Sequence, residues 1–91
     1  MKSLKQAIDK LISKYGYTDV LKGYRLISDW KLIVGEEIWK HTKPIRVDFN
    51  KLFLKVDSPV WRNELYIRKE EIINKINSFM GSIIIEEIIF K

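Results

Sequence analysis

Two short runs with a period of two constrain the fold of this chain more than any other feature. In residues 45–49 and 51–57, apolar side chains recur at every second position: Ile45, Val47 and Phe49, then Leu52, Leu54 and Val56. Such alternation is typical of strands that bury one face and leave the other in solvent. A tight turn at Asn50-Lys51 would join the two runs, so we predict an antiparallel hairpin over residues 45–57.

A segment with the apolar spacing of helices precedes the hairpin. Residues 3–41 carry apolar side chains three and four positions apart, which indicates a helical prefix with one buried face. Gly16 and Gly35 are the expected breaks within this prefix, and it ends before Pro44. Its second helix would bury a wide apolar stripe made by Val20, Leu21, Tyr24, Ile27, Trp30, Ile33 and Val34.

A third helix and a last strand follow the hairpin. Ser58 can cap a helix whose first turn contains Pro59, and Gly81 can end it. These signals predict a helix over residues 59–80. Residues 83–90 are rich in β-branched isoleucine, which favours a strand.

The predicted order of elements is α-α-β-β-α-β. It describes an α+β domain of two layers, with a three-stranded mixed sheet and the helices on one face. The last strand would pair in parallel with one strand of the hairpin, because the third helix lies between them. A chain of 91 residues allows one domain, residues 1–91.

The last strand also defines the outer surface of the sheet. With Ile88 and Phe90 turned toward the helices, the opposite face carries Phe53 together with Ile83, Ile85 and Ile89. An open apolar face of this kind, or the edge strand beside it, would invite a partner or a second copy of the chain.

Composition narrows the possible functions. The chain has no cysteine and one histidine, His41, so disulfides, thiolate metal sites and cysteine nucleophiles are excluded. Glu37 lies four residues before His41, but one His and one Glu are too few for a zinc site. Without a glycine-rich phosphate loop or paired catalytic carboxylates, we expect no enzyme activity and no cofactor. The lack of cysteine, of a signal peptide and of a membrane-spanning run favours the cytoplasm.

Three tryptophans are candidates for contact with a partner protein. Trp30 and Trp61 are either core residues or anchors with one exposed edge, since Trp is enriched at such anchors. Trp61 is the better candidate because it lies in the first turn of its helix, beside Arg62. Trp39 follows Ile38 directly, so the two side chains point in different directions and one of them is half-exposed. The expected partner-binding residues are Trp61, Trp39, Trp30 and Arg62.

Basic residues concentrate in and before the hairpin. Residues 1–55 hold 12 Lys and Arg against 6 Asp and Glu, within a net charge of +5 for the chain. Arg46 and Lys55 would project from the same face as Phe53, where cations hold phosphates and the ring stacks on a base. Asp48 shares that face, and the alternative is a solvated surface whose lysines protect strand edges. The candidate nucleic-acid-binding residues are Lys40, Lys43, Arg46, Lys51, Phe53 and Lys55.

A series of short motifs resembles a bacterial family of small domains. The motifs are Trp30, Val34-Gly35, Glu36-Glu37-Ile38, His41-Thr42-Lys43-Pro44, residues 52–58 (LFLKVDS), Trp61 with Leu65, and Ile88-Ile89-Phe90. In this order and spacing they are similar to the DciA family, which includes operators, or loaders, of the replicative helicase in DNA replication. The resemblance covers about residues 4–90.

This resemblance implies a KH-like fold, binding to a DnaB-type replicative helicase and affinity for single-stranded DNA. The expected function is a non-catalytic, nucleoid-associated module that helps load the helicase. The sequence lacks the disordered basic tail of many family members, so DNA binding is expected to be weak. It also lacks the GXXG loop with which KH domains clamp a nucleic-acid backbone. The alternative is a stand-alone KH-like domain that binds RNA or DNA without a helicase.

Overall fold

The computed structural model describes residue 4, residues 6–7 and residues 17–91. The first predicted helix, which would precede the break at Gly16, therefore lies almost wholly outside the described residues. The described elements are α2 (Tyr17–Ser28), α3 (Trp30–Val34), α4 (Glu36–His41), β1 (Thr42–Asp48), β2 (Lys51–Val56), α5 (Pro59–Ile67), α6 (Lys69–Met80) and β3 (Glu87–Phe90). None of the helices described is long and apolar enough to cross a lipid bilayer.

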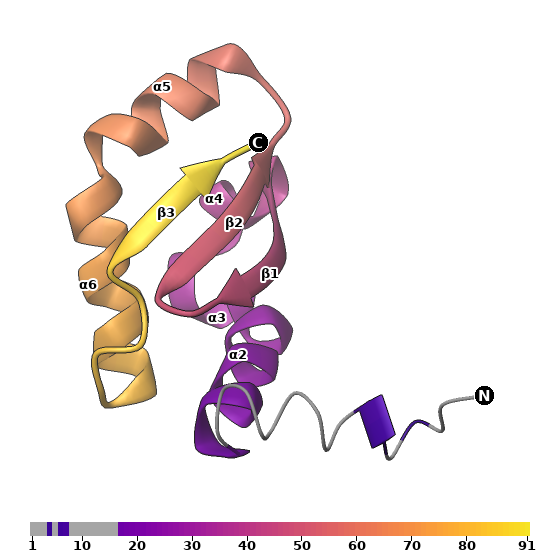
Figure 1. Cartoon of the computed structure of the whole chain (residues 1–91). Helices are drawn as coiled ribbons and strands as arrows, with labels where there is room; N and C mark the ends of the chain where they lie inside the picture. Colours follow the sequence, from indigo (N-terminus) through magenta and orange to yellow (C-terminus); the bar gives the residue numbers. More distant parts are fainter. Residues whose placement is uncertain (1–3, 5, 8–16) are drawn as a thin grey trace.

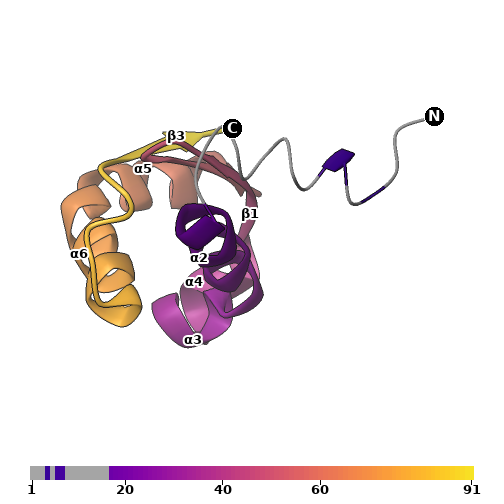
Figure 2. The same ribbon diagram turned by 60° about the horizontal axis from the view of Figure 1, so that its bottom comes forward.

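The three strands form one mixed sheet in the order β1-β2-β3 (Figure 1). β1 and β2 are antiparallel, and β3 returns parallel to β2 after the helical crossover through α5 and α6. Figure 2 shows α2, α3, α4 and α6 beneath one face of this sheet. The predicted α+β architecture, its element order and the parallel pairing of the last strand are thus confirmed.

The core lies between the sheet and the helices. Leu52, Leu54 and Val56 of β2 point inward and are buried, whereas the residues between them are not. They pack with buried side chains from the helices, including Trp30, Leu65 and Ile76. Because burying a large aliphatic side chain contributes about 1.5–3 kcal/mol, this single layer supplies most of the driving force for folding.

Trp30 connects the helical prefix to the sheet through a hydrogen bond. Its side chain is 2% exposed, and its indole Nε1 donates a hydrogen bond of 2.8 Å to Thr42 Oγ1 at the start of β1. The Thr42 hydroxyl in turn donates to the Ile38 carbonyl oxygen at 2.7 Å, inside α4. The buried indole N–H therefore has a partner, as burial of a polar group requires.

The helical prefix bends twice within residues 17–41. Gly35 separates α3 from α4 with φ +88°, a backbone conformation that side-chain-bearing residues seldom adopt, so the predicted break is confirmed. A second break at Asp29, between α2 and α3, was not predicted. Leu26 is fully buried, whereas Leu21 and Tyr24 of the predicted stripe are 48% and 61% exposed.

The hairpin differs from its prediction at two points. The turn is formed by Phe49 and Asn50, one residue earlier than predicted, and Phe49 is exposed with φ +56°. A register shift between Pro44 and Arg46 leaves Ile45 as the extra residue of a β-bulge. Ile45 is therefore 47% exposed, although the alternation predicted it to face the core.

The predicted helix over residues 59–80 is two helices. Ser58 caps α5 as predicted, because its Oγ accepts the Trp61 backbone N–H at 3.1 Å. Arg68 then leaves the helical conformation at φ −94°, ψ 15°, so α5 and α6 meet at an angle (Figure 1). Gly81 ends α6 in the left-handed conformation, in agreement with its predicted role.

The last strand is shorter than predicted because Asn77 holds the segment before it. The Asn77 side chain accepts the backbone N–H groups of Ile84 and Ile85, each at 3.0 Å, and donates to the Ile85 carbonyl oxygen at 2.9 Å. These bonds hold residues 83–86 outside the sheet, and β3 begins at Glu87. The predicted outward position of Ile85 is wrong, since its side chain is fully buried, and Ile83 lies in the loop before the strand, 77% exposed.

We predict that Asn77→Ala destabilises the fold, because it leaves the backbone groups of Ile84 and Ile85 without their partner. The expected loss is about 1–3 kcal/mol in the free energy of unfolding, measured by urea denaturation. Asn74→Ala, on the exposed side of the same helix, is the matched control and should change the free energy by less than about 0.5 kcal/mol. Equal effects of the two substitutions would contradict the role given to Asn77.

Candidate functional site

The three tryptophans occupy three different environments. Trp30 is a core residue with its N–H satisfied by Thr42. Its place among the expected partner-binding residues is therefore corrected, because a side chain with 2% exposure offers no surface to a partner. Trp61 is half-buried against the core, and Trp39 is 42% exposed. The surface candidates are thus Trp61 and Trp39.

Trp61 belongs to a small cluster where α4, β2 and α5 meet. Its indole stacks on the His41 ring with a centroid distance of 4.5 Å and an interplanar angle of 17°. His41 Nδ1 lies 3.1 Å from both carboxylate oxygens of Asp57, and the Asp57 backbone N–H donates to the His41 carbonyl oxygen at 3.0 Å. One face of the indole is therefore covered by His41, which Asp57 in turn holds in place.

Trp39 and Arg62 present separate polar contacts at the surface. The ammonium of Lys31 lies 4.6 Å from the centroid of the Trp39 ring, a cation–π arrangement. The guanidinium of Arg62 donates from Nη2 to the Lys91 carbonyl oxygen at 2.9 Å, which ties α5 to the residue after β3. Within the described part of the chain, no three His, Asp or Glu side chains gather where a metal ion could bind.

Most of the candidate nucleic-acid-binding residues lie on the open face of the sheet. Arg46 pairs with Phe53 across the hairpin, and Lys43 pairs with Lys55. In the register of the sheet, Lys51 lies opposite Asp48 of β1 on one side and opposite Glu87 of β3 on the other. Four basic side chains therefore share this face with two acidic ones. Lys40 belongs to α4 and is the one member of the predicted set outside the sheet.

Phe53 lies between two cations on this face. The Arg46 guanidinium carbon is 4.2 Å from the centroid of its ring, and Lys91 Nζ is 5.5 Å from it. The ring attracts both cations through its negative face. Ile89 pairs with Phe53 in the sheet, but the buried Ile85 and the loop residue Ile83 are missing from this face. The predicted apolar surface is thus a mixed cationic and aromatic one, which we call the basic face (Lys43, Arg46, Lys51, Phe53 and Lys55).

Two carboxylates, one in α6 and one in β3, have lowered pKa values. A hydrogen bond from Lys69 Nζ at 2.6 Å, helped by one from the Ile88 N–H, lowers the pKa of Glu87 below its ordinary value. A hydrogen bond from Arg68 lowers the pKa of Glu71 in the same way. The Lys69–Glu87 pair links α6 to β3 at the edge of the sheet.

Sequence reasoning missed Lys91 and the side chains along the outer edge of β3. Lys91 follows the last strand, and only the pairing of β3 with β2 brings its ammonium over Phe53. Beyond β3 lies a groove lined in part by Tyr66, Lys69 and Phe90. The alternation of the last strand could indicate that Phe90 faces the helices. No local sequence pattern, however, indicates that Phe90 lies beside α5.

Comparison with known proteins identifies the family. The family model described as "Dna[CI] antecedent, DciA" matches residues 3–90, nearly the whole chain. The chain belongs to the DciA family. The resemblance inferred from the motif order is thereby confirmed, and this DciA-family chain carries the family pattern across both the helical prefix and the sheet.

Relatives in three organisms resemble this DciA-family chain. A UPF0232 protein of Corynebacterium glutamicum is 30% identical over 86 residues, which is 94% of this chain and 48% of the relative. A UPF0232 protein of Streptomyces avermitilis is 28% identical over 81 residues, 87% of this chain and 45% of the relative. One of Mycobacterium tuberculosis is 22% identical over 85 residues, 93% of this chain and 46% of the relative. The chain spans about half the length of these relatives.

We predict that the Lys69–Glu87 pair makes stability depend on acid pH. Because folding lowers the pKa of Glu87 below about 4.5, its stabilising contribution is present above that value and is lost as the pH falls through the lower, folded pKa. In thermal unfolding followed between about pH 3 and 6, Glu87→Gln should flatten the fall in Tm. Glu70→Gln removes an exposed carboxylate of α6 and controls for net charge. A pH profile of Glu87→Gln that coincides with the wild-type profile would contradict the prediction.

Proposed function

We propose that this chain is a non-catalytic interaction module that binds a DnaB-type replicative helicase and helps load it on single-stranded DNA. The observation that carries the proposal is membership of the DciA family over residues 3–90. The proposed work is done by contacts alone: one surface holds the helicase and another holds the strand that the helicase will encircle.

The helicase contact is proposed at the aromatic surface residues Trp61 and Trp39, with Arg62 beside them. Support comes from the half-exposed state of both indoles, since Trp and Arg anchors dominate protein interfaces when they can be desolvated. The stacked His41 restrains Trp61, so fewer side-chain conformations are lost when a partner binds.

The DNA contact is proposed at the basic face. The two carboxylates on that face, Asp48 and Glu87, reduce its attraction for phosphates, so weak binding is expected. A base that stacks on Phe53 must displace the guanidinium of Arg46 from the ring. The displaced guanidinium would then be free to pair with a phosphate, and recognition would depend on charge and stacking more than on base identity.

We predict that Trp61→Ala weakens helicase binding at least about tenfold, because a desolvated Trp anchor contributes about 2 kcal/mol or more. Calorimetry with the purified helicase of the same bacterium measures the effect, and circular dichroism verifies the fold of the variant. Tyr24→Ala, an exposed aromatic on α2, is the matched control and should bind as the wild type does. No binding of the wild type at about 100 μM helicase would refute the helicase proposal.

A second candidate function is a stand-alone KH-like domain that binds RNA or DNA without a helicase. It is favoured by the paired Arg46 and Phe53 at the centre of the basic face. The two helices between parallel strands β2 and β3 are compatible with a KH-like core. At the bend between these helices, however, Ile67, Arg68 and Lys69 stand where a glycine loop would allow close approach of a phosphate backbone.

We predict that Arg46→Glu weakens binding of an oligo-dT strand about tenfold and makes the affinity less sensitive to salt, because one phosphate contact is lost and one repulsion is added. Fluorescence anisotropy across a salt series measures both quantities. Lys75→Glu makes the same charge change on α6, away from the basic face, and should leave the affinity nearly unchanged. If both candidates fail, so that neither helicase nor oligonucleotide binds, the interaction-module proposal fails with them.

A further inference from the structure

β3 is an edge strand with one side unpaired in the sheet. The order β1-β2-β3 leaves its outer edge toward α5. The backbone N–H groups of Glu87 and Lys91 donate to carbonyl oxygens of Asn50 and Leu54, on the β2 side. Because peptide groups alternate along a parallel strand, those of Ile88 and Phe90 point to the outer edge.

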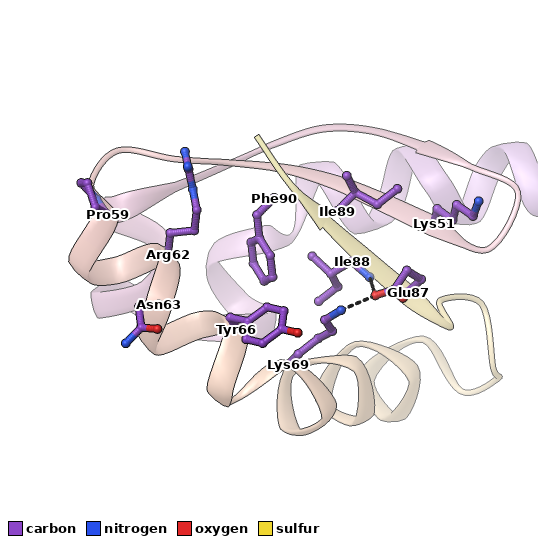
Figure 3. A pocket seen from close by; sticks show the side chains of 10 residues that line it. All are labelled: Lys51, Pro59, Arg62, Asn63, Tyr66, Lys69, Glu87, Ile88, Ile89 and Phe90. Carbon is purple, nitrogen blue, oxygen red and sulfur yellow. Dashed lines mark hydrogen bonds and ion pairs between the residues drawn. The ribbon is translucent and has the colours of Figure 1, made fainter.

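A groove of about 760 Å³ runs between this edge and α5 (Figure 3). Phe90 points from β3 into the groove toward Tyr66, and the two ring centroids are 6.5 Å apart at an interplanar angle of 59°. Pro59 and Ile88 add apolar lining. The groove thus combines a strand edge that can form main-chain hydrogen bonds with pockets for side chains, which are the two requirements for strand addition.

Charge selects what can enter the groove. Lys51, Arg62 and Lys69 line it against one acidic residue, Glu87. The Glu87 carboxylate is already held by Lys69 and accepts the outward Ile88 N–H at 2.9 Å, so it occupies the position that an incoming acidic side chain would take. An entering carboxylate can replace it there without leaving the ammonium unpaired.

We propose that this groove binds an extended acidic segment of a partner protein, which adds to β3 as a fourth strand. Alternate side chains of the segment would pack against Tyr66 and Phe90, and its carboxylates would pair with Arg62 and Lys69. A nucleic-acid strand fits less well, because it has no main-chain N–H and C=O groups that could pair with the outer edge of β3. The groove shares Lys51 with the basic face and Arg62 with the proposed helicase contact. Its test measures binding of a peptide, so its failure can be told apart from failure of the proposed function.

The test uses a defined probe, an acetylated and amidated peptide of about ten residues that alternates valine and glutamate. Amide chemical shifts of the ¹⁵N-labelled chain are followed during titration to about 1 mM peptide. The expected result is saturable change along β3 and α5, with slower hydrogen exchange of the Phe90 amide, whose N–H becomes bonded. A peptide of alternating valine and lysine should bind at least about fivefold more weakly.

Variants and a competitor complete the test. Arg62→Glu should weaken binding of the acidic peptide about fivefold or more, whereas the matched reversal Lys75→Glu on α6 should not. Thermal unfolding establishes that both variants are folded. The inference is overturned if the acidic peptide leaves β3 unchanged, if it binds only at another surface, or if an oligo-dT strand occupies the groove and the peptide does not.

Discussion

The hydrogen-bonded contact between Trp30 and Thr42 is the constraint on which the rest of the structure depends. It joins three elements at one point, because Trp30 begins α3, the Ile38 carbonyl lies in α4 and Thr42 begins β1. A buried indole with an unsatisfied N–H would cost free energy, so the geometry of the corner is well defined. Thr42 also pairs with Val56 at the end of β2, and the corner therefore sets where the hairpin sits against the helices.

The proposed helicase contact and the basic face both follow from this arrangement. His41 precedes Thr42 directly, so the fixed start of β1 also fixes the imidazole on which Trp61 stacks. The register that begins at Thr42 and Val56 continues, past the bulge, to Arg46 opposite Phe53. Packing in the core thus determines which side chains meet at the surface.

Local patterns predicted the hairpin, the parallel last strand and the shared face of Arg46, Lys55 and Phe53. The hairpin and its shared face could be predicted because a period of two depends only on neighbouring residues, and the parallel pairing because a helix lies between the paired strands. The bend at Arg68 and the buried Ile85 were missed because they depend on distant partners; Asn77, for example, reaches across the loop to Ile84 and Ile85. An apolar residue in a helical stripe can lie in the core or at the surface. The different exposures of Trp30 and Trp39 could therefore be known only from the three-dimensional arrangement.

The mixed sheet also implies an order of assembly. β1 and β2 are joined by a two-residue turn, so little chain must be restrained to bring them together. β3 pairs with the other edge of β2 only after residues 57–86 have been arranged, and the entropy of closing that longer connection opposes the pairing. Until then the central strand, with its buried leucines, has only one neighbour. The helices of the crossover and the residues of β3 must therefore form their contacts in concert, and the hairpin serves as the template on which the last strand completes the domain.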